Sequence, residues 1–252
     1  MILIVSLLVA ATVGVATCWL APRMGRGRVI YELAPDRPHA FGYDMSWLAV
    51  RSQNTEAVID AMGLVGETAA NWNSGIGTVY DNRLGSERIF VSPPVDGWTF
   101  VVSLALPHPV GANYVDKCSP LLASLAAQFS DVQYYFCYPA LDFFAWVRFR
   151  DGRLTRAFAS TDQGLVWSKG KPTREEQALG LRLFELRGVT GRSGDTGGEI
   201  LLSPTEDQVM QVAKAWSLDP TRLGAGDAPS ALGYIVPAPS SWRTERVRKS
   251  AA

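Results

Sequence analysis

The chain has 252 residues, of which 47% are hydrophobic and 19% are charged, and its 24 Lys and Arg residues balance its 24 Asp and Glu residues. The apolar content excludes a wholly disordered chain, and the neutral charge argues against a dedicated nucleic-acid binder, which would normally carry a basic excess. Three cysteines exclude a disulfide scaffold, and two histidines argue against a histidine-rich metal site.

The first 21 residues contain no charged side chain and consist mostly of Ile, Leu, Val and Ala. As a helix this segment would be about 31 Å long, enough to cross a bilayer core of about 30 Å. Arg23, Arg26 and Arg28 follow directly. Because basic residues favour the cytoplasmic side, we expect residues 1–22 to be a single-pass inner-membrane anchor, followed by a juxtamembrane linker (23–45) and a cytoplasmic domain.

A cleaved signal peptide is the main alternative, and it would export the domain to the periplasm. Such a peptide normally starts with a basic region and has a shorter apolar core, whereas no Lys or Arg precedes the apolar run here. A lipoprotein attached at Cys18 is disfavoured by the neighbouring Thr17 and Trp19. Cys118 and Cys137 would stay reduced in the cytoplasm and could pair in the periplasm, so the sequence leaves both states open.

Beyond the linker, apolar periodicity predicts one globular domain over residues 46–223. Residues 46–52 have the pattern of a strand, and Asn54 is placed to cap a helix over residues 55–62. Residues 64–87 follow with no regular pattern. The domain therefore begins with a strand, a helix and an irregular segment.

Two strands are then predicted at 88–92 and 98–106, a helix at 114–129 and a further strand at 132–138. With the first strand and helix, these elements follow the order β-α-β-β-α-β. That order is typical of a ferredoxin-like fold with an antiparallel sheet. The sequence therefore predicts the α+β class.

A hairpin at 142–150 and 154–160 extends this sheet, because an Asp-Gly pair between the two strands favours a tight turn. A short strand at 165–168 follows. Two C-terminal helices are then predicted, and they complete the domain.

The first C-terminal helix is predicted at 174–186 and the second at 205–216, which starts with a Thr-x-x-Gln capping box. Between them, the glycine-rich residues 188–198 have the composition of a flexible loop. Residues 224–252 are rich in Gly, Ala and Pro and end in basic residues, so we expect a flexible basic tail. Such a tail is either solvated or held near anionic lipid.

No sequence pattern assigns a chemistry. The glycine-rich stretches lack the Lys-Ser/Thr of a P-loop and the third glycine of a dinucleotide-binding motif. His39 and His108 lie beside prolines in predicted loops. We therefore predict no catalytic residue, no metal site and no cofactor. A carboxylate enzyme remains an alternative because four acidic residues lie near strand ends: Asp131, Asp142, Asp151 and Asp162.

Aromatic side chains concentrate on or beside the predicted sheet, and arginines lie among them. This composition is typical of protein-binding surfaces, although most such rings in proteins belong to the core. Stacking on single-stranded nucleic acid uses similar residues, but the neutral charge argues against it. The candidate binding residues are Trp47, Trp72, Trp98, Tyr135, Phe144, Trp146, Arg148 and Arg150.

Seven short motifs give the chain a resemblance to a family of uncharacterised bacterial proteins over roughly residues 46–223. They are WLAVRS (47–52), NW (71–72), FVSPPVDGW (90–98), VQYYF (132–136), RDGRLxRA (150–157), PTxEE (172–176) and WSLDP (216–220). The resemblance implies an accessory or immunity-type protein that binds a toxin, and it assigns no catalytic residue.

Together these features predict a non-enzymatic protein-binding domain on a membrane anchor, with an immunity protein that neutralises a toxin as the most specific form. The expected partners are a protein, either a toxin or a subunit of a membrane complex, and membrane lipid through residues 1–22. The alternatives are an enzyme with a carboxylate site and a structural subunit of a membrane assembly.

Overall fold

The computed structural model describes residues 29–162, 164–179 and 204–247. The chain divides into two compact units, Met1–Tyr31 and Glu32–Ala252, and the helices and strands described all belong to the second. The predicted anchor, residues 1–22, lies outside the described residues. Within the described ranges, no helix combines the length and the apolar character needed to cross a bilayer.

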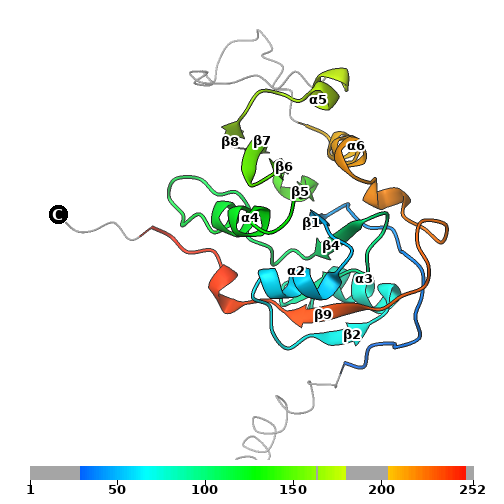
Figure 1. Ribbon diagram of the computed structural model, residues 1–252. Helices are drawn as coiled ribbons and strands as arrows, with labels where there is room; N and C mark the ends of the chain where they lie inside the picture. Colours follow the sequence, from blue (N-terminus) through cyan, green and yellow to red (C-terminus); the bar gives the residue numbers. More distant parts are fainter. Residues whose placement is uncertain (1–28, 163, 180–203, 248–252) are drawn as a thin grey trace, which may run out of the picture. The chain divides into compact units, whose positions relative to one another are not determined.

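The strands are β1 (Met45–Arg51), β2 (Thr68–Ala70), β3 (Arg88–Val91), β4 (Trp98–Val102), β5 (Asp131–Tyr138), β6 (Phe143–Arg150), β7 (Arg153–Thr161), β8 (Gly164–Lys169) and β9 (Gly233–Pro237). The helices are α2 (Thr55–Ala61), α3 (Trp72–Tyr80), α4 (Cys118–Ala126), α5 (Arg174–Ala178) and α6 (Glu206–Trp216). In the described part of the chain, the strands form one nine-stranded antiparallel sheet in the order β2-β9-β3-β4-β1-β5-β6-β7-β8 (Figure 1). The predicted α+β class with an antiparallel sheet is confirmed.

The predicted strands β3, β4, β1 and β5 lie side by side in that order at the centre of the sheet. Between α2 and β3 the chain adds β2 and α3, which occupy the stretch that has no regular pattern in the sequence. Asn71 starts α3, because its side-chain oxygen accepts a hydrogen bond from the backbone N–H of Ser74 at 2.9 Å. A side-chain cap thus begins a helix that its glycines would not predict.

The first face of the sheet is covered by α2 and α4. Asn54 caps α2 as predicted, with its side-chain oxygen accepting a hydrogen bond from Ala57 N at 3.1 Å. Because side chains alternate along a strand, Leu48 and Val50 of β1 point to this face. They belong to one buried cluster with Val58 of α2 and the apolar side chains of α4.

The second face is covered by α3 and α6, so the sheet lies between two helical layers (Figure 1). On the α3 side, the rings of Trp72 and Phe90 meet edge to face at 5.3 Å. On the α6 side, Trp216 lies 6.1 Å from Tyr135 of β5. The predicted capping box of α6 is present. Of the helix predicted at 174–186, the described part is α5, and residues 180–203 lie outside the described residues.

Two glycines of α3 have opposite surroundings, which gives a matched test of this packing. A Cβ at buried Gly75 would overlap the ring of Phe90, whereas a Cβ at exposed Gly77 would meet nothing within 4 Å. We expect Gly75→Ala to lower the free energy of unfolding by about 1–3 kcal/mol through overpacking. Gly77→Ala should raise it by roughly 0.5–1 kcal/mol, because glycine is costly within a helix. Urea denaturation of the two variants measures both changes, and equal effects would contradict the packing of α3 on β3.

The segment 224–252, predicted as a flexible tail, contributes β9 to the sheet, between β2 and β3. A Cβ at Gly233 would overlap the backbone oxygen of Val91, so glycine permits the close approach at the start of β9. The folded part of the chain therefore continues beyond Leu223 to residue 247. The sequence pattern misses this strand because it is short and is flanked by Gly, Ala and Pro, which indicate turns.

The C-terminal strap, residues 238–247, lies along the loop that precedes α4. The backbone N–H of Val115 donates to the carbonyl of Glu245 at 2.8 Å, and that of Val247 donates to the carbonyl of Asn113 at 2.9 Å. Because these backbone groups pair with the strap, the loop is extended and α4 begins later than the sequence predicts.

Part of the predicted linker, residues 23–45, is also bound to the domain. The carboxylate of Asp36 accepts hydrogen bonds from Trp72 N at 2.6 Å and from Asn73 N at 2.9 Å, at the positive end of α3. The compact unit accordingly begins at Glu32. The globular part of the chain is thus longer at both ends than the predicted 46–223.

The two described cysteines lie on opposite faces of the sheet. Cys118 of α4 is in the buried cluster of the first face together with Phe136 of β5. Cys137 follows Phe136 along β5, and strand alternation directs it to the second face. Both thiols are buried and free, and burial raises the pKa of Cys137 to about 12. In this fold the sheet separates the two cysteines, so they form no disulfide with each other.

Candidate functional site

The six aromatic residues predicted for the binding surface are buried, each with 6% exposure or less. They are Trp47, Trp72, Trp98, Tyr135, Phe144 and Trp146. All lie on the second face of the sheet or in the helix that covers it, where Trp47 stacks on Tyr135 with ring centroids 5.0 Å apart. The structure therefore moves these rings from the predicted surface to the core.

The two predicted arginines come together with a third at one end of the sheet, forming the arginine cluster: Arg51, Arg148 and Arg150. Strand register places these arginines close together. Arg150 of β6 lies opposite Asp131 of β5, and Arg51 of β1 lies opposite Trp98 of β4. Directly opposed residues of neighbouring strands are side by side on the same face. The cluster thus forms where β1 and β6 end and where β4 and β5 begin.

One carboxylate serves two guanidinium groups in this cluster. Asp131 Oδ2 accepts from Arg148 Nη2 at 2.6 Å, and Arg148 Nε lies 3.2 Å from both carboxylate oxygens. Arg150 Nε lies farther away, at 3.6 Å from Oδ2. The Arg148 side chain is 12% exposed, whereas that of Arg150 is 59% exposed. Arg150 is therefore the more accessible cation.

Arg51 is held at the other side of the cluster by two contacts. Its Nη1 donates to the backbone oxygen of Asp96 at 3.0 Å, and its guanidinium carbon lies 5.1 Å from the centroid of the Trp98 ring. A guanidinium over an aromatic face is attracted by the ring quadrupole. Trp98 thus positions an exposed arginine instead of forming the surface itself.

A buried hydrogen-bond network fixes the cluster from behind. Gln133 Nε2 donates to Asp131 Oδ1 at 3.2 Å and to the carbonyl of Trp216 at 3.1 Å. Tyr135 Oη donates to Gln133 Oε1 at 2.7 Å. Burial raises the pKa of Tyr135 well above its usual value, so its hydroxyl stays protonated and remains a donor. The position of Asp131 is therefore set by both β5 and α6.

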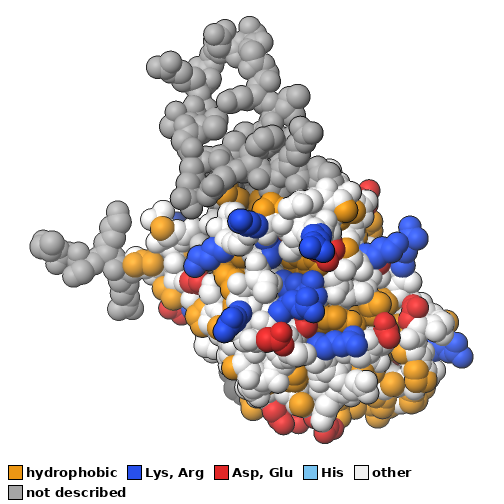
Figure 2. Space-filling model, turned by 45° about the horizontal axis from the view of Figure 1, so that its top comes forward, with side chains coloured by type: hydrophobic (Ala, Val, Ile, Leu, Met, Phe, Trp, Pro, Cys, Tyr) orange, Lys and Arg blue, Asp and Glu red, His pale blue; other side chains and the backbone are white. Residues whose placement is uncertain are grey.

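The cluster borders a recess of about 310 Å³. Two acidic residues lie nearby. Asp151 lines the recess. The pKa of Glu175 is lowered mainly by a backbone hydrogen bond and further by the charges of Arg148 and Arg150. Figure 2 shows a face of the molecule where Lys and Arg side chains gather with Asp and Glu side chains between them. Guanidinium groups in such a recess can bind a carboxylate or a phosphate.

A second buried ion pair attaches α5 to the sheet. Arg156 of β7 and Glu176 of α5 are both almost fully buried, with Arg156 Nε 2.9 Å from Glu176 Oε1. Trp146 Nε1 donates to the same oxygen at 2.8 Å, and Thr173 N donates to Glu176 Oε2 at 2.7 Å. Sequence reasoning missed this pair, although Arg156 is a charged residue at an inward position of its strand.

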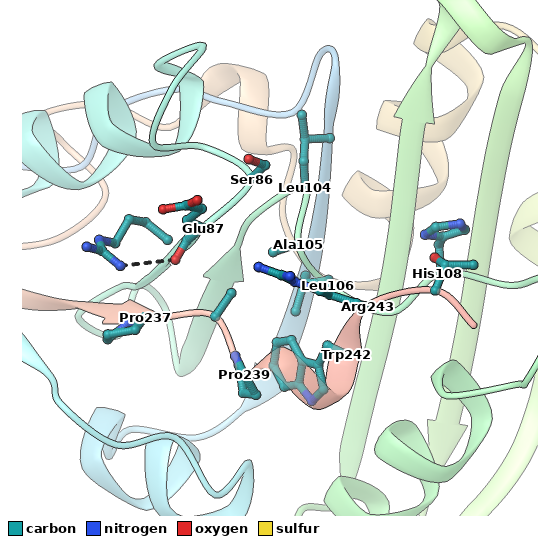
Figure 3. Close-up of a pocket in the computed structure, with 13 residues that line it drawn as sticks. Ser86, Glu87, Leu104, Ala105, Leu106, His108, Pro237, Pro239, Trp242 and Arg243 are labelled. Carbon is teal, nitrogen blue, oxygen red and sulfur yellow. Dashed lines mark hydrogen bonds between the residues drawn. The ribbon is translucent and has the colours of Figure 1, made fainter. Parts of the chain in front are cut away.

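The strand-end pocket, a cavity of about 400 Å³, lies at the opposite end of β4 from the arginine cluster (Figure 3). Its walls come from the start of β3, the segment after β4, and the C-terminal strap, and they include Leu106, His108, Trp242 and Arg243. His108 also packs on the rings of Phe136 and Phe143. The predicted loop histidine is thus half-buried at the border of a cavity.

Burial lowers the pKa of His108 below its ordinary value of 6.5, which makes stability pH-dependent. Between the folded and unfolded pKa values, the unfolded chain binds a proton that the folded chain does not. The free energy of unfolding should therefore fall as the pH drops below 6.5, and His108→Gln should reduce this fall. Denaturation at several pH values tests it, with the more exposed His39→Gln as control. An unchanged pH slope in His108→Gln would contradict the assignment.

Among the residues that the structure describes, no group of three or more His, Cys, Asp or Glu side chains is arranged to hold a metal ion. Comparison of the chain with protein family models, with curated proteins and with solved structures found no match. The arginine cluster and the strand-end pocket are therefore interpreted from their own geometry.

Proposed function

We propose that this protein is a membrane-anchored protein-binding domain whose arginine cluster contacts acidic side chains of a partner. The observation that carries the proposal is the sharing of Asp131, which binds Arg148 at 2.6 Å and Arg150 only at 3.6 Å. Arg150 keeps donors available and is well exposed. Arginine and tryptophan are enriched among the residues that contribute most to protein–protein binding.

Preorganisation of the cluster supports the same proposal. Asp131 is held by Gln133, and Arg51 is held by Trp98 and the Asp96 carbonyl, so these side chains have little freedom left to lose. A partner that binds a preordered surface loses less conformational entropy than one that must order it. Rigid arginines at a recess therefore suit specific recognition of acidic side chains.

In its specific form, the proposal is an immunity-type protein that binds and neutralises a toxin. The resemblance over residues 46–223 supports this form, and the strand order β3-β4-β1-β5 supports a ferredoxin-like core for it. Residues 1–22 would anchor the domain, and the arginines that follow favour a cytoplasmic location. A C-terminal fluorescent-protein fusion should fluoresce if the domain is cytoplasmic. A fusion of alkaline phosphatase that is active instead would place the domain in the periplasm.

The binding proposal is tested by co-expressing the full chain with the products of the genes adjacent to its own. One product should co-purify with the chain, and under the immunity form the chain should protect cells from that product. Charge reversal in Arg51→Glu/Arg150→Glu should weaken co-purification at least about tenfold, because it replaces attraction by repulsion. The matched control is Arg222→Glu, which is 79% exposed and lies outside the cluster.

Two outcomes would contradict this proposal. Binding that survives the double charge reversal would remove the arginine cluster from the interface. The absence of any binding or protection, together with turnover of a substrate, would favour the carboxylate-enzyme alternative. Stable co-purification with other membrane subunits, without protection, would favour the structural-subunit alternative.

A further inference from the structure

The strand-end pocket combines apolar residues with two arginines, Arg88 and Arg243. Arg88 donates to the carbonyl of Glu87 at 3.3 Å, whereas the guanidinium of Arg243 makes no hydrogen bond or ion pair with another described residue. Leu106 is buried at its base, and Trp242 and Ala238 of the C-terminal strap form part of its wall. Figure 3 shows the side chain of Arg243 extending toward Ala105 on the other side of the pocket residues, beside the ring of Trp242. A charged group at an apolar wall is the usual composition of a site for a small amphipathic molecule.

The backbone around Arg243 is fixed, whereas its guanidinium has no partner in the described part of the chain. Its backbone N–H donates to the carbonyl of Ser240 at 3.2 Å, and its carbonyl accepts from Lys117 Nζ at 2.6 Å. No hydrogen bond or ion pair joins the guanidinium to another described residue, and Glu87, which also lines the pocket, makes no ion pair with it. Arg243 can therefore donate to a ligand.

The wall that carries Arg243 is held against the domain before any ligand binds. Lys117 Nζ donates to Glu245 Oε1 at 2.8 Å, next to the backbone hydrogen bonds between the strap and the loop before α4. At the start of the strap, Ala238 N donates to the carbonyl of Glu87 at 2.9 Å. Contacts at both ends of the strap keep the pocket formed, so binding requires little ordering.

We propose that the strand-end pocket binds a small organic carboxylate with a flat apolar body. The carboxylate pairs with the guanidinium of Arg243, and the apolar body lies against Trp242 and Leu106. A guanidinium matches a carboxylate with two parallel hydrogen bonds, and an indole ring gives a flat body a large contact area. This site is separate from the arginine cluster, because the two lie at opposite ends of β4.

The probe is 4-(trifluoromethyl)benzoate, and its binding to the full chain is followed by fluorine NMR line broadening. We expect a dissociation constant of about 1 mM or tighter, as is usual for a ligand of this size in a formed pocket. The neutral 4-(trifluoromethyl)benzamide has the same shape and should bind at least about tenfold more weakly, because it lacks the charge-assisted pair.

Three variants locate the binding. Arg243→Gln should weaken benzoate binding at least about tenfold by removing the cation. Ala238→Phe should block binding by filling the pocket. Arg246→Gln is the matched control, because its guanidinium lies over the Tyr114 ring and not among the pocket residues, and it should keep binding. Circular dichroism of each variant confirms that the domain stays folded.

Several results would overturn the inference. The first is the absence of line broadening at about 5 mM benzoate, a concentration that covers weak fragment binding. The second is equal binding of benzoate and benzamide. The third is unchanged benzoate binding in Arg243→Gln or in Ala238→Phe. Loss of binding only in Arg246→Gln would place the probe elsewhere. None of these results depends on the protein partner, so the inference fails or holds independently of the proposed function.

Discussion

Glu176→Gln is expected to lower the free energy of unfolding by about 3–5 kcal/mol, the usual cost of breaking a buried ion pair by removing one partner. The substitution preserves the shape of the side chain but leaves the Arg156 guanidinium buried without a counter-charge. It also weakens the acceptor for Trp146 Nε1 and for the backbone of Thr173, and thereby the cap of α5. Urea denaturation followed by tryptophan fluorescence measures the change.

The neighbouring Glu175→Gln is the matched control for this prediction. Glu175 lies on the same helix but is only half-buried and makes no buried ion pair in the described part of the chain, so its substitution should cost less than about 1 kcal/mol. A double variant, Arg156→Leu/Glu176→Leu, should regain most of the stability lost in the single variant, because it leaves no unpaired charge. If Glu176→Gln and Glu175→Gln proved equally mild, the buried pair would not hold α5 on the sheet.

Trp47→Ala is expected to lower the free energy of unfolding by about 3–5 kcal/mol, the usual cost of removing a large aromatic side chain from a core. Trp47 is fully buried, stacks on Tyr135 and meets the ring of Phe41 edge to face at 6.0 Å. Its removal would leave a cavity between the central strand and the helices of the second face. Chemical denaturation of the full chain measures the loss.

Trp47→Phe is the matched variant, and it should cost less than about 2 kcal/mol, because the ring is retained and only part of the volume is lost. This prediction separates a core role from a binding role. A surface tryptophan at a protein interface would lose partner binding on truncation while stability stayed within about 0.5 kcal/mol of the unmodified chain. That result would return Trp47 to the predicted binding surface.

The strands and helices with strong periodicity could be predicted from the sequence, and those without it could not. The observed bounds of β1, β5, β6 and β7 lie within one residue of the predicted ranges at each end. The hairpin between β6 and β7 was predicted from the Asp-Gly pair, and in the structure Asp151 and Gly152 both adopt the positive φ that this turn requires. In contrast, β2, β9 and α3 are short or rich in glycine, so long-range pairing and caps decide their structure.

The candidate site was predicted in part. The sequence identified Arg148, Arg150 and Trp98, but it could not show that Arg51 and Asp131 meet them, since this depends on strand register. The aromatic residues were assigned to a surface because one face of β6 mixes rings with charges. The rings of that face are in fact covered by helices, Arg148 pairs with Asp131 at its rim, and Arg150 alone of the two predicted arginines is well exposed. Composition alone does not distinguish a covered mixed face from an exposed one.

The position of β9 has a consequence for biosynthesis. Until residues 233–237 have left the ribosome, β3 has one unpaired edge and β2 has no neighbour in the sheet. A chain stopped before Gly233 keeps that bare edge, and bare edges pair with other chains and aggregate. Premature termination would therefore give insoluble protein instead of a partly active domain. For the same reason, the nascent chain needs this late segment before the sheet is complete.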